Sequence, residues 1–485
     1  MNRFNLKLIF SILGLLLSIN GVAMLLALPF TLYYGEDWRP IVYSSAITIF
    51  AGLPMWLILS KTTRRELKRR DGYLVVSLGW VIMSFFGALP FILSGVIPDL
   101  TSAFFETISG FTTTGASVIT DIEATPKGIL LWRSLTQWIG GMGIIVLAVA
   151  ILPILGIGGM QLFVAEAPGI SPDKLKPRIK DTAKRLWIIY VGLTGLEAIL
   201  LMIGGMNFFD AINHSLTTMA TGGFSTKNDS IAHFTSPYIQ YVITIFMILA
   251  GTSFTLTYFM LKRQFHKVFT NEEFVTYLSF LAFATVAITG FVHFSGSPSF
   301  EDSFRATLFQ VVSVVTTTGF VSADYTAWTP LITMVFFALM FIGGSAGSTA
   351  GGIKVVRHII LFKNSFLEMK RQLHPSAVIP VRLNHKAINQ EITFNVLAFI
   401  IIYFLIFSLG SIAMAWVGLD FTSALGSVAT SLGNIGPGIG SVGPVNNFAH
   451  IPDTGKWILA LMMLLGRLEL FTVLILFTPY FWKHI

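Results

Sequence analysis

The sequence contains no cysteine and few charged residues. Without a thiol in its 485 residues, disulfides, thiolate catalysis and Cys-ligated metals are excluded, and redox chemistry is not expected. Charged residues make up only 12% of the chain, against about 25% in a soluble globular protein. Hydrophobic residues make up 54%, and the mean hydropathy is +0.74. This composition identifies a polytopic membrane protein.

The formal net charge of +8 does not indicate a nucleic-acid partner, because the basic residues are distributed along the chain in a one-sided way. Of the 32 Lys and Arg, 25 fall in segments that one alternating topology places on a single side. These segments are the N-terminus, 61–70, 174–185, 262–267, 354–386 and Lys483. By the positive-inside rule, the sequence predicts that both termini are cytoplasmic.

A short signature occurs four times, each time after an apolar segment too short to span a bilayer. The copies are Thr112-Thr113-Thr114-Gly115, Ala220-Thr221-Gly222-Gly223, Thr316-Thr317-Thr318-Gly319 and Ser431-Leu432-Gly433-Asn434. If Gly115, Gly223, Gly319 and Gly433 are equivalent, the copies lie 108, 96 and 114 residues apart (223−115, 319−223 and 433−319). Such a repeat holds two spanning helices, so the pattern predicts fourfold pseudosymmetry about a pore.

Two spanning helices, 5–33 and 39–60, precede the first repeat. Arg3 and Lys7 before an apolar run resemble a signal peptide, but the run is long and lacks a convincing cleavage site, so a spanning helix is favoured. Each repeat then has a helix, a short helix, a loop and a returning helix. The expected segments are 73–95, 100–111 and 128–152; 183–205, 208–219 and 237–261; 273–294, 300–315 and 329–360; and 392–417, 421–430 and 454–481.

The predicted fold is therefore all-α, with four pseudo-symmetric repeats around a central pore and an added N-terminal helix pair. The chain divides into 1–70 for the pair and 71–180, 181–270, 271–390 and 391–485 for the four repeats. The longer connections at 160–182 and 361–391 contain prolines and most of the basic charge. They are either a docking surface for a partner or anionic lipid, or simply determinants of topology.

The loops suit cation passage, because backbone carbonyls can replace a hydration shell without trapping the ion as a carboxylate would. Glycine gives such a loop the dihedral angles it needs, and neighbouring threonines add hydroxyl ligands. The C-terminal end of each short helix also favours a cation. The candidate ligands are Thr112, Thr113, Thr114, Gly115, Ala220, Thr221, Gly222, Gly223, Thr316, Thr317, Thr318, Gly319, Leu432, Gly433, Asn434 and Ile435.

The return helix of the third repeat is interrupted at 343–352 by a run made only of Gly, Ala, Ser and Thr. Such a run does not hold an α-helix unaided, since each interior Gly costs about 1 kcal/mol relative to Ala. Non-helical backbone at this depth must be buried in protein or line water. We expect a mobile constriction beneath the filter; close helix packing through small residues is the alternative. The candidate gate residues here are Gly343, Gly344, Ser345, Ala346, Gly347, Gly351 and Gly352.

Arg467 lies within an apolar run of the last helix, where an ionisable group is costly and by default functional. Glu469 does not share its face, so a backbone carbonyl or the 343–352 loop is the expected partner. The residue either gates cations or forms a buried pair that fixes helix packing. Glu106, Asn213 and Gln310 are expected to hydrogen-bond behind the loops as scaffold.

With these motifs, the sequence resembles the potassium-translocating subunits of the bacterial Trk system, in the Trk/Ktr/HKT superfamily. The resemblance covers nearly the whole chain, including the helix pair, the Gly-rich break and Arg467. It implies a gated, cation-selective pore for K⁺ uptake in the bacterial inner membrane. It also implies a homodimer with one pore per protomer and a cytoplasmic nucleotide-binding regulatory ring, the TrkA subunit. No organic cofactor is expected on this chain.

Two other functions remain to be weighed. Gly343-Gly344-Ser345-Ala346-Gly347 matches a serine-hydrolase pattern, but no histidine lies at the same depth, so an enzyme is not expected. A symporter that couples K⁺ to H⁺ or Na⁺ is the closer alternative, with Glu106, Glu197 and Glu469 as candidate carboxylates. Only one glycine is shared by all four loops, and the fourth has Leu432 where the first and third have Thr, so we expect K⁺ to be distinguished from Na⁺ only weakly.

Overall fold

The computed structural model describes residues 4–60, 68–146, 175–294 and 299–482. These residues are almost entirely helical, apart from a two-residue ribbon of β1 (Arg382–Leu383) and β2 (Lys386–Ala387). Six helices within them are long and apolar enough to cross a membrane, and eight if each of two bent helix pairs counts as one span. The predicted class, an all-helical multi-pass membrane protein, is confirmed.

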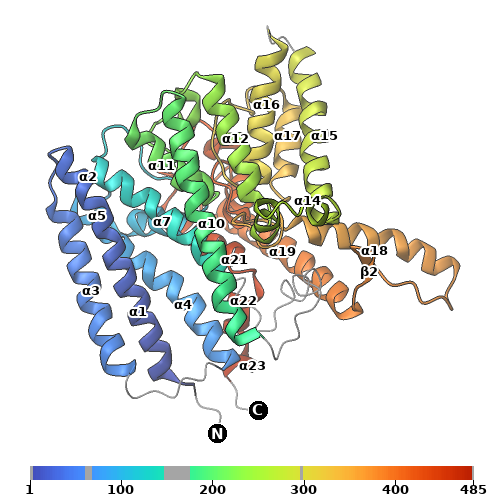
Figure 1. Ribbon diagram of the computed structural model, residues 1–485, viewed down its shortest axis with the longest axis horizontal. Coiled ribbons are helices and arrows are strands. Elements are labelled where there is room, and N and C mark those ends of the chain that lie inside the picture. The colour runs from blue at the N-terminus through green and yellow to red at the C-terminus, as the bar shows by residue number, and fades with distance from the viewer. Residues whose placement is uncertain (1–3, 61–67, 147–174, 295–298, 483–485) are drawn as a thin grey trace.

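The N-terminal pair packs as an antiparallel hairpin beside the first repeat (Figure 1). It consists of α1 (Leu6–Met24), the 3-10 turn η1 (Leu25–Ala27), α2 (Leu28–Tyr33) and α3 (Arg39–Ser60). Small residues let the two helices approach closely, because a Cβ on Gly14 or Gly52 would meet the backbone of the other helix. The carboxylate of Glu36 then accepts hydrogen bonds from the N–H groups of Lys127 and Gly128, which joins the pair to the repeats.

The four repeats share one order of elements. The first has α4 (Arg69–Gly87), α5 (Leu89–Leu93), short helix α6 (Leu100–Phe111) and return helix α7 (Lys127–Val146). The second has α10 (Leu175–Ile203), short helix α11 (Phe208–Met219), η4 (Ser230–His233), α12 (Pro237–Gly251), α13 (Phe254–Leu261) and α14 (Phe265–Phe269).

The third repeat has α15 (Glu272–Phe294), short helix α16 (Phe300–Val315), α17 (Pro330–Leu339) and α18 (Val355–Leu373). The fourth has α19 (Gln390–Trp416), short helix α20 (Phe421–Gly433), η5 (Gly440–Val442), α21 (Asp453–Arg467), α22 (Phe471–Leu474), η6 (Ile475–Phe477) and α23 (Pro479–Trp482). The end of the expected 128–152 helix and most of the 160–182 connection lie outside the described residues.

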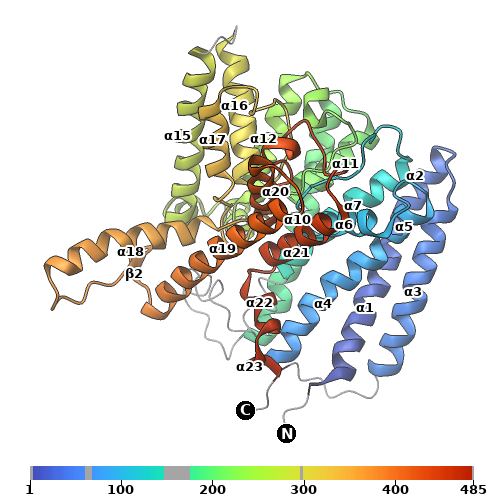
Figure 2. The same cartoon turned by 180° about the vertical axis from the view of Figure 1, so that it is seen from behind.

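The short helices pack in cyclic order. Each contacts the two longer helices of its own repeat, and α6, α11 and α16 also contact the return helix of the preceding repeat, namely α21, α7 and α12. Figures 1 and 2 show α7, α10, α12, α20 and α21 gathered toward the middle of the molecule, with α1, α3 and α15 at its outside. The short helices and their loops thus lie in the interior.

Within the described residues, return helices are broken in three of the four repeats, whereas the sequence predicted a break only in the third. The break in the third repeat is confirmed, between α17 and α18. The predicted continuous helices 237–261 and 454–481 are wrong, because α12 and α13 meet at 111° and α21 and α22–η6 at 112°. The second break falls at Thr252 and Ser253, and the fourth at Glu469 and Leu470, whose φ values are positive. Each break exposes backbone groups that need partners.

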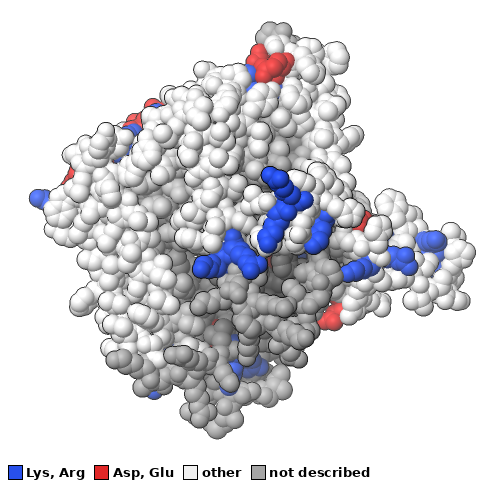
Figure 3. All heavy atoms as spheres, viewed as in Figure 1, with Lys and Arg blue, Asp and Glu red and all other residues white. Residues whose placement is uncertain are grey.

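Basic side chains gather at one level of the molecule. On the face in Figure 3, basic side chains form a band at the level of α14 and along α18, and acidic side chains lie at the far tip of the third repeat and also beside α18. The two described chain ends lie at the same end of the molecule (Figures 1 and 2). An alternating topology with one basic side accounts for both observations.

Candidate functional site

All four short helices end in the same turn. In the first, the N–H of Thr113 bonds to the Gly110 carbonyl at 2.9 Å and the N–H of Thr114 to the Ser109 carbonyl at 2.8 Å. The same two bonds recur at Thr221 and Gly222, at Thr317 and Thr318, and at Asn434 and Ile435. This is the Schellman pattern, in which the residue after the C-cap adopts the left-handed conformation.

The left-handed position is not glycine in any of the four copies. It is Thr113, Thr221, Thr317 and Asn434, with φ of 53°, 51°, 56° and 54°. For a β-branched residue this conformation is a genuine outlier, and each such strained residue costs about 1–3 kcal/mol. All four residues are fully buried, so the surrounding packing holds them in place. Strain repeated at the three related threonines indicates a functional requirement for these side chains.

Two residues after each left-handed position lies a glycine that touches the next repeat. A Cβ added to Gly115, Gly223, Gly319 or Gly436 would fall less than 3.0 Å from the carbonyl oxygen of Gly222, Thr318, Ile435 or Thr114, respectively. The contacts run from the first repeat to the second, third and fourth and back to the first. We call these four glycines and four carbonyls the glycine ring. The ring closes only because no side chain intervenes.

The glycine ring corrects the register expected for the fourth loop. The sequence aligned Gly433 with Gly115, but Gly433 is the last residue of α20 and the equivalent of Thr112. Gly436 has the position and the positive φ of Gly115. Leu432, a predicted ligand, lies inside α20, which continues three residues beyond its expected end. The alignment failed because the fourth loop has two glycines, Gly433 and Gly436, and the sequence does not show that the helix ends at Asn434, which tolerates the left-handed conformation.

Hydroxyl groups cluster beneath the ring in the first and third repeats. Thr112 and Thr114 bond to each other at 2.8 Å, and Thr316 and Thr318 do so at the same distance. Thr113 Oγ1 and Asn434 Oδ1, at two of the left-handed positions, are among the buried side-chain atoms that have no hydrogen-bond partner in the described residues. Buried polar atoms normally have partners, so these two oxygens are available to a ligand.

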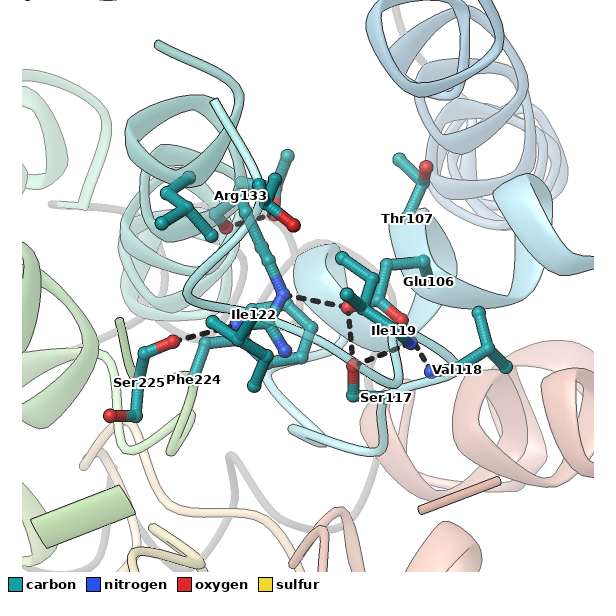
Figure 4. Close-up of polar contacts among 12 residues, drawn as sticks. Glu106, Thr107, Ser117, Val118, Ile119, Ile122, Arg133, Phe224 and Ser225 are labelled. Atoms are coloured by element: carbon teal, nitrogen blue, oxygen red, sulfur yellow. Dashed lines mark hydrogen bonds and ion pairs between the residues drawn. The ribbon is translucent and has the colours of Figure 1, made fainter. Parts of the chain in front are cut away.

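An ion pair behind the first loop links it to the second (Figure 4). Arg133 of α7 donates from Nε to Glu106 at 2.7 Å and from Nη1 to the Ser225 carbonyl at 3.0 Å. Glu106 also accepts hydrogen bonds from the Ser117 hydroxyl and the Val118 N–H. The Arg133 guanidinium covers the Phe224 ring at 3.6 Å from its centroid. The pair therefore fixes two neighbouring loops relative to each other.

The scaffold expected behind the loops is present, with one change of residue. Behind the third loop, the Gln310 side chain donates a hydrogen bond to the Ser322 hydroxyl at 3.3 Å. This contact corresponds to the one between Glu106 and Ser117 behind the first loop. In the second repeat the equivalent position is His214, which bonds to Ser225, whereas the expected Asn213 donates to the carbonyl of Phe209 within its own helix. The sequence analysis also missed Gln137, whose amide contacts both Gly222 and Phe224 of the second loop. Its place on a return helix gave no motif to recognise.

The intramembrane loop, residues 340–354 between α17 and α18, lies directly below the ring. The Gly351 N–H donates to the Thr317 hydroxyl at 2.6 Å. Ser345 and Thr349 donate their N–H groups to Gly251 and Ala250 at the break of the second repeat. The loop thus contacts Thr317, whose backbone is left-handed, and the broken return helix of the second repeat. These hydrogen bonds satisfy backbone groups that the breaks of the second and third repeats leave without helical partners.

Arg467 is buried at the break of the fourth repeat, with 2% of its surface exposed. Its Nη1 donates to the Thr349 carbonyl of the intramembrane loop at 2.8 Å, which confirms the partner expected from the sequence. Glu469 pairs instead with Arg357 of α18. Among the described residues, Nε and Nη2 of Arg467 have no partner. The breaks of the second, third and fourth repeats therefore meet at one place below the ring.

Fold and site together define a class: multi-pass membrane proteins whose four related repeats close a ring of backbone above a set of broken helices. A family model described as TrkH, cation transport protein, matches residues 41–292 and 274–483. The chain belongs to this TrkH family.

Individual relatives match along the whole length. The Trk system potassium uptake protein TrkH of Halomonas elongata is 40% identical over 483 residues, covering 99% of this chain and all of that protein. The protein of the same name from Escherichia coli K12 is 41% identical over 480 residues, with 98% of each chain covered. The crystal structure of the potassium transporter TrkH from Vibrio parahaemolyticus has a TM-score of 0.90 and 38% identity, and the match covers 99% of this chain and 100% of that one.

We predict that Glu106→Ala lowers the stability of the protein by about 3–5 kcal/mol, because it leaves the buried Arg133 without its counter-charge. Thermal unfolding in detergent measures the effect. Glu123→Ala is the matched control, since the Glu123–Lys227 pair is partly exposed and contributes less than about 1 kcal/mol. Equal melting temperatures for the two variants would contradict the structural role of the Glu106–Arg133 pair.

Proposed function

We propose that this chain carries K⁺ into a bacterial cell through a gated, cation-selective pore in the inner membrane. The observation that carries the proposal is the closed glycine ring, in which each of four loops contacts the next. The relatives named as potassium uptake proteins support K⁺ as the transported ion.

Passage through the ring needs oxygen ligands in place of water. We assign these ligands to the backbone carbonyls of the four loops, with the Thr113 hydroxyl and the Asn434 carbonyl oxygen as additional ligands at the inner mouth. The partially negative C-terminal ends of α6, α11, α16 and α20 all meet at the loops and favour a cation. No carboxylate is needed at the ring, so the ion is not trapped.

The gate in this proposal is the intramembrane loop with Arg467. The loop lies under the ring and is fixed by contacts with three repeats, so its displacement opens the path. Arg467 adds a positive charge whose Nε and Nη2 groups are free of protein partners in the described residues. A fixed cation at this depth repels a permeating cation, and the Thr349 contact couples that charge to the loop.

An exposed apolar stripe on α18 provides a surface for a partner. Phe362, Phe366, Met369 and Leu373 follow each other at intervals of four, three and four residues along α18 and are all exposed. This is the spacing of a helix seam that packs on a second helix, and α18 projects from the molecule (Figure 1). We propose that α18 contributes to a homodimer, and that the basic inner face, with cytoplasmic termini, binds a TrkA-like nucleotide-binding ring that controls the gate.

Ion flux into liposomes containing the purified protein tests the function. We expect K⁺ flux down its electrochemical gradient without accompanying H⁺ or Na⁺, and a modest preference for K⁺ over Na⁺. Flux of H⁺ or Na⁺ in fixed ratio to K⁺ would instead establish a symporter, and strict exclusion of Na⁺ would contradict the weak selectivity. Addition of the nucleotide-binding subunit with ATP or ADP should change the flux; no change would exclude control by that partner.

Gly115→Ala is predicted to reduce K⁺ flux by about tenfold or more, since its Cβ overlaps the Gly222 carbonyl and a perturbation of about 1.4 kcal/mol suffices for a factor of ten. Gly95→Ala is the control, because Gly95 also has a positive φ but no atom within 4 Å of an added Cβ. Liposome flux compares the two. Similar losses in both would show that backbone strain, rather than ring closure, is responsible.

Replacement of Arg467 by Ala is expected to raise basal K⁺ flux by about tenfold, because it removes both a fixed cation and the charged hydrogen bond to Thr349, which is worth about 1.5–3 kcal/mol. Arg305→Ala serves as control, since Arg305 lies on the outer part of α16 and, within the described residues, pairs with Glu301 and Asp302 of its own helix. A folded Arg467→Ala protein with unchanged flux would remove Arg467 from the gate.

For the dimer, Phe366→Glu in α18 should convert the detergent-solubilised protein from dimer to monomer, because it places a charge in the apolar seam. Light scattering measures the molar mass of the protein. Glu368→Lys also changes a charge on α18 but lies away from the seam, so it should leave the dimer intact. A Phe366→Glu protein that stays dimeric would place the interface elsewhere.

A further inference from the structure

We propose that Glu273 is the fixed hinge point of the intramembrane loop, so that the loop opens by releasing its tip while both of its ends stay attached to α15. The inference rests on the proposed gate and concerns how that gate moves. Glu273, a buried carboxylate outside the glycine ring, thereby positions the intramembrane loop.

The carboxylate of Glu273 binds both ends of the loop. Its Oε1 accepts a hydrogen bond from the Ala346 N–H at 2.7 Å and another from the Val356 N–H at 3.3 Å. Ala346 follows the start of the loop, and Val356 is in the first turn of α18. One oxygen therefore joins two segments ten residues apart in sequence, and it satisfies a helix N-terminal N–H that has no partner within its own helix.

The loop ends also bind each other at this point. The Gly343 N–H donates to the Ile353 carbonyl at 2.8 Å, and the Val355 N–H donates to the Gly344 carbonyl at 3.1 Å. We call these four residues the neck of the loop. The neck closes the loop into a compact unit, and Glu273 fastens that unit to a different helix.

Glu273 is itself held firmly. It lies in the first turn of α15 and is only 1% exposed. On either side of it, the Glu272 N–H donates to the Asn384 side chain at 2.7 Å and the Phe274 N–H donates to the Asn271 side chain at 2.9 Å. Lys354, at the end of the loop, interacts electrostatically with both Glu273 and Glu469.

Contacts at the tip of the loop are of a different kind. Thr349 and Gly351 bind Arg467, Thr317 and the break of the second repeat, all of which belong to other elements that line the path. The tip has one charged hydrogen bond, from Arg467 to the Thr349 carbonyl, and its other contacts are neutral. Charged hydrogen bonds in a low-dielectric site are stronger than neutral ones, so once Arg467 leaves Thr349 the two bonds to the Glu273 carboxylate outlast the remaining tip contacts. The tip is the part that can be released while the neck remains attached.

Basal flux of variants in liposomes tests this hinge. Glu273→Ala should raise basal K⁺ flux by about tenfold or more, because two buried N–H groups lose their acceptor. The ratio of K⁺ to Na⁺ flux should stay that of the unmodified protein, because the ring is not touched. Glu273→Gln keeps an oxygen acceptor and should restore most of the closure. Glu272→Ala is the matched control, since Glu272 is partly exposed and pairs with Lys363 instead of the loop.

Several results would overturn the hinge: basal flux of Glu273→Ala equal to that of Glu272→Ala, Glu273→Gln as leaky as Glu273→Ala, or a changed K⁺ to Na⁺ ratio. Deletion of 348–350 separates this failure from failure of the gate itself. If that deletion leaves flux unchanged, the loop is not the gate, and the hinge proposal is rejected together with the gate. If the deletion opens the path and Glu273→Ala does not, only the hinge is wrong.

Hydrogen exchange provides a test that does not depend on the folding of Glu273→Ala. In Arg467→Ala, the N–H groups of Thr349 and Gly351 should exchange faster than in the unmodified protein, whereas those of Ala346 and Val356 should stay protected. Loss of protection at all four positions together would show that the loop unravels from end to end, and the hinge would be rejected.

Discussion

The structure depends on the approach of each glycine of the ring to a carbonyl oxygen of the next repeat. Gly115, Gly223, Gly319 and Gly436 leave room for a backbone contact that any side chain would prevent. The strained turns that precede them, the buried short helices and the Arg133–Glu106 pair all serve to bring four loops to that distance. Because the contacts form a cycle, misplacing one loop disturbs two neighbours, which explains why so many polar groups are committed to positioning rather than to the ring itself.

A second constraint follows from the membrane. Backbone inside a bilayer must be paired, so a helix can break there only if another segment takes up the freed groups. The breaks of the second, third and fourth repeats meet this requirement by lying together, with Gly251, Thr349 and Arg467 bonded across them. The result is a layer of non-helical backbone below the ring, fixed by a few hydrogen bonds. Such a layer can change its arrangement without unfolding the helices around it, which is what a gate requires.

Charge has a separate role at each level of the molecule. The ring itself is neutral, the layer below it contains Arg467, Lys354, Arg357 and two carboxylates, and the surface of α14 and α18 is basic. Neutral oxygen suits an ion that must leave again, whereas buried opposite charges fix geometry, since removing one partner is far more costly than the pair is stabilising. In the proposed function, the basic surface faces the cytoplasm and is the region where the regulator binds.

The sequence alone determined the all-helical membrane class, the four repeats, three of the four loop registers, the break in the third repeat and a loop or carbonyl partner for Arg467. These follow from apolar length, from a repeated motif and from runs of small residues, all of which are local in the chain. Only the tertiary structure decided the register of the fourth loop, the breaks at Ser253 and Glu469, and the roles of Arg133, Gln137 and Glu273. A lone Asn can end a helix as a glycine does, and an isolated polar residue in an apolar helix has no meaning until its partner, often more than 70 residues away, is placed beside it.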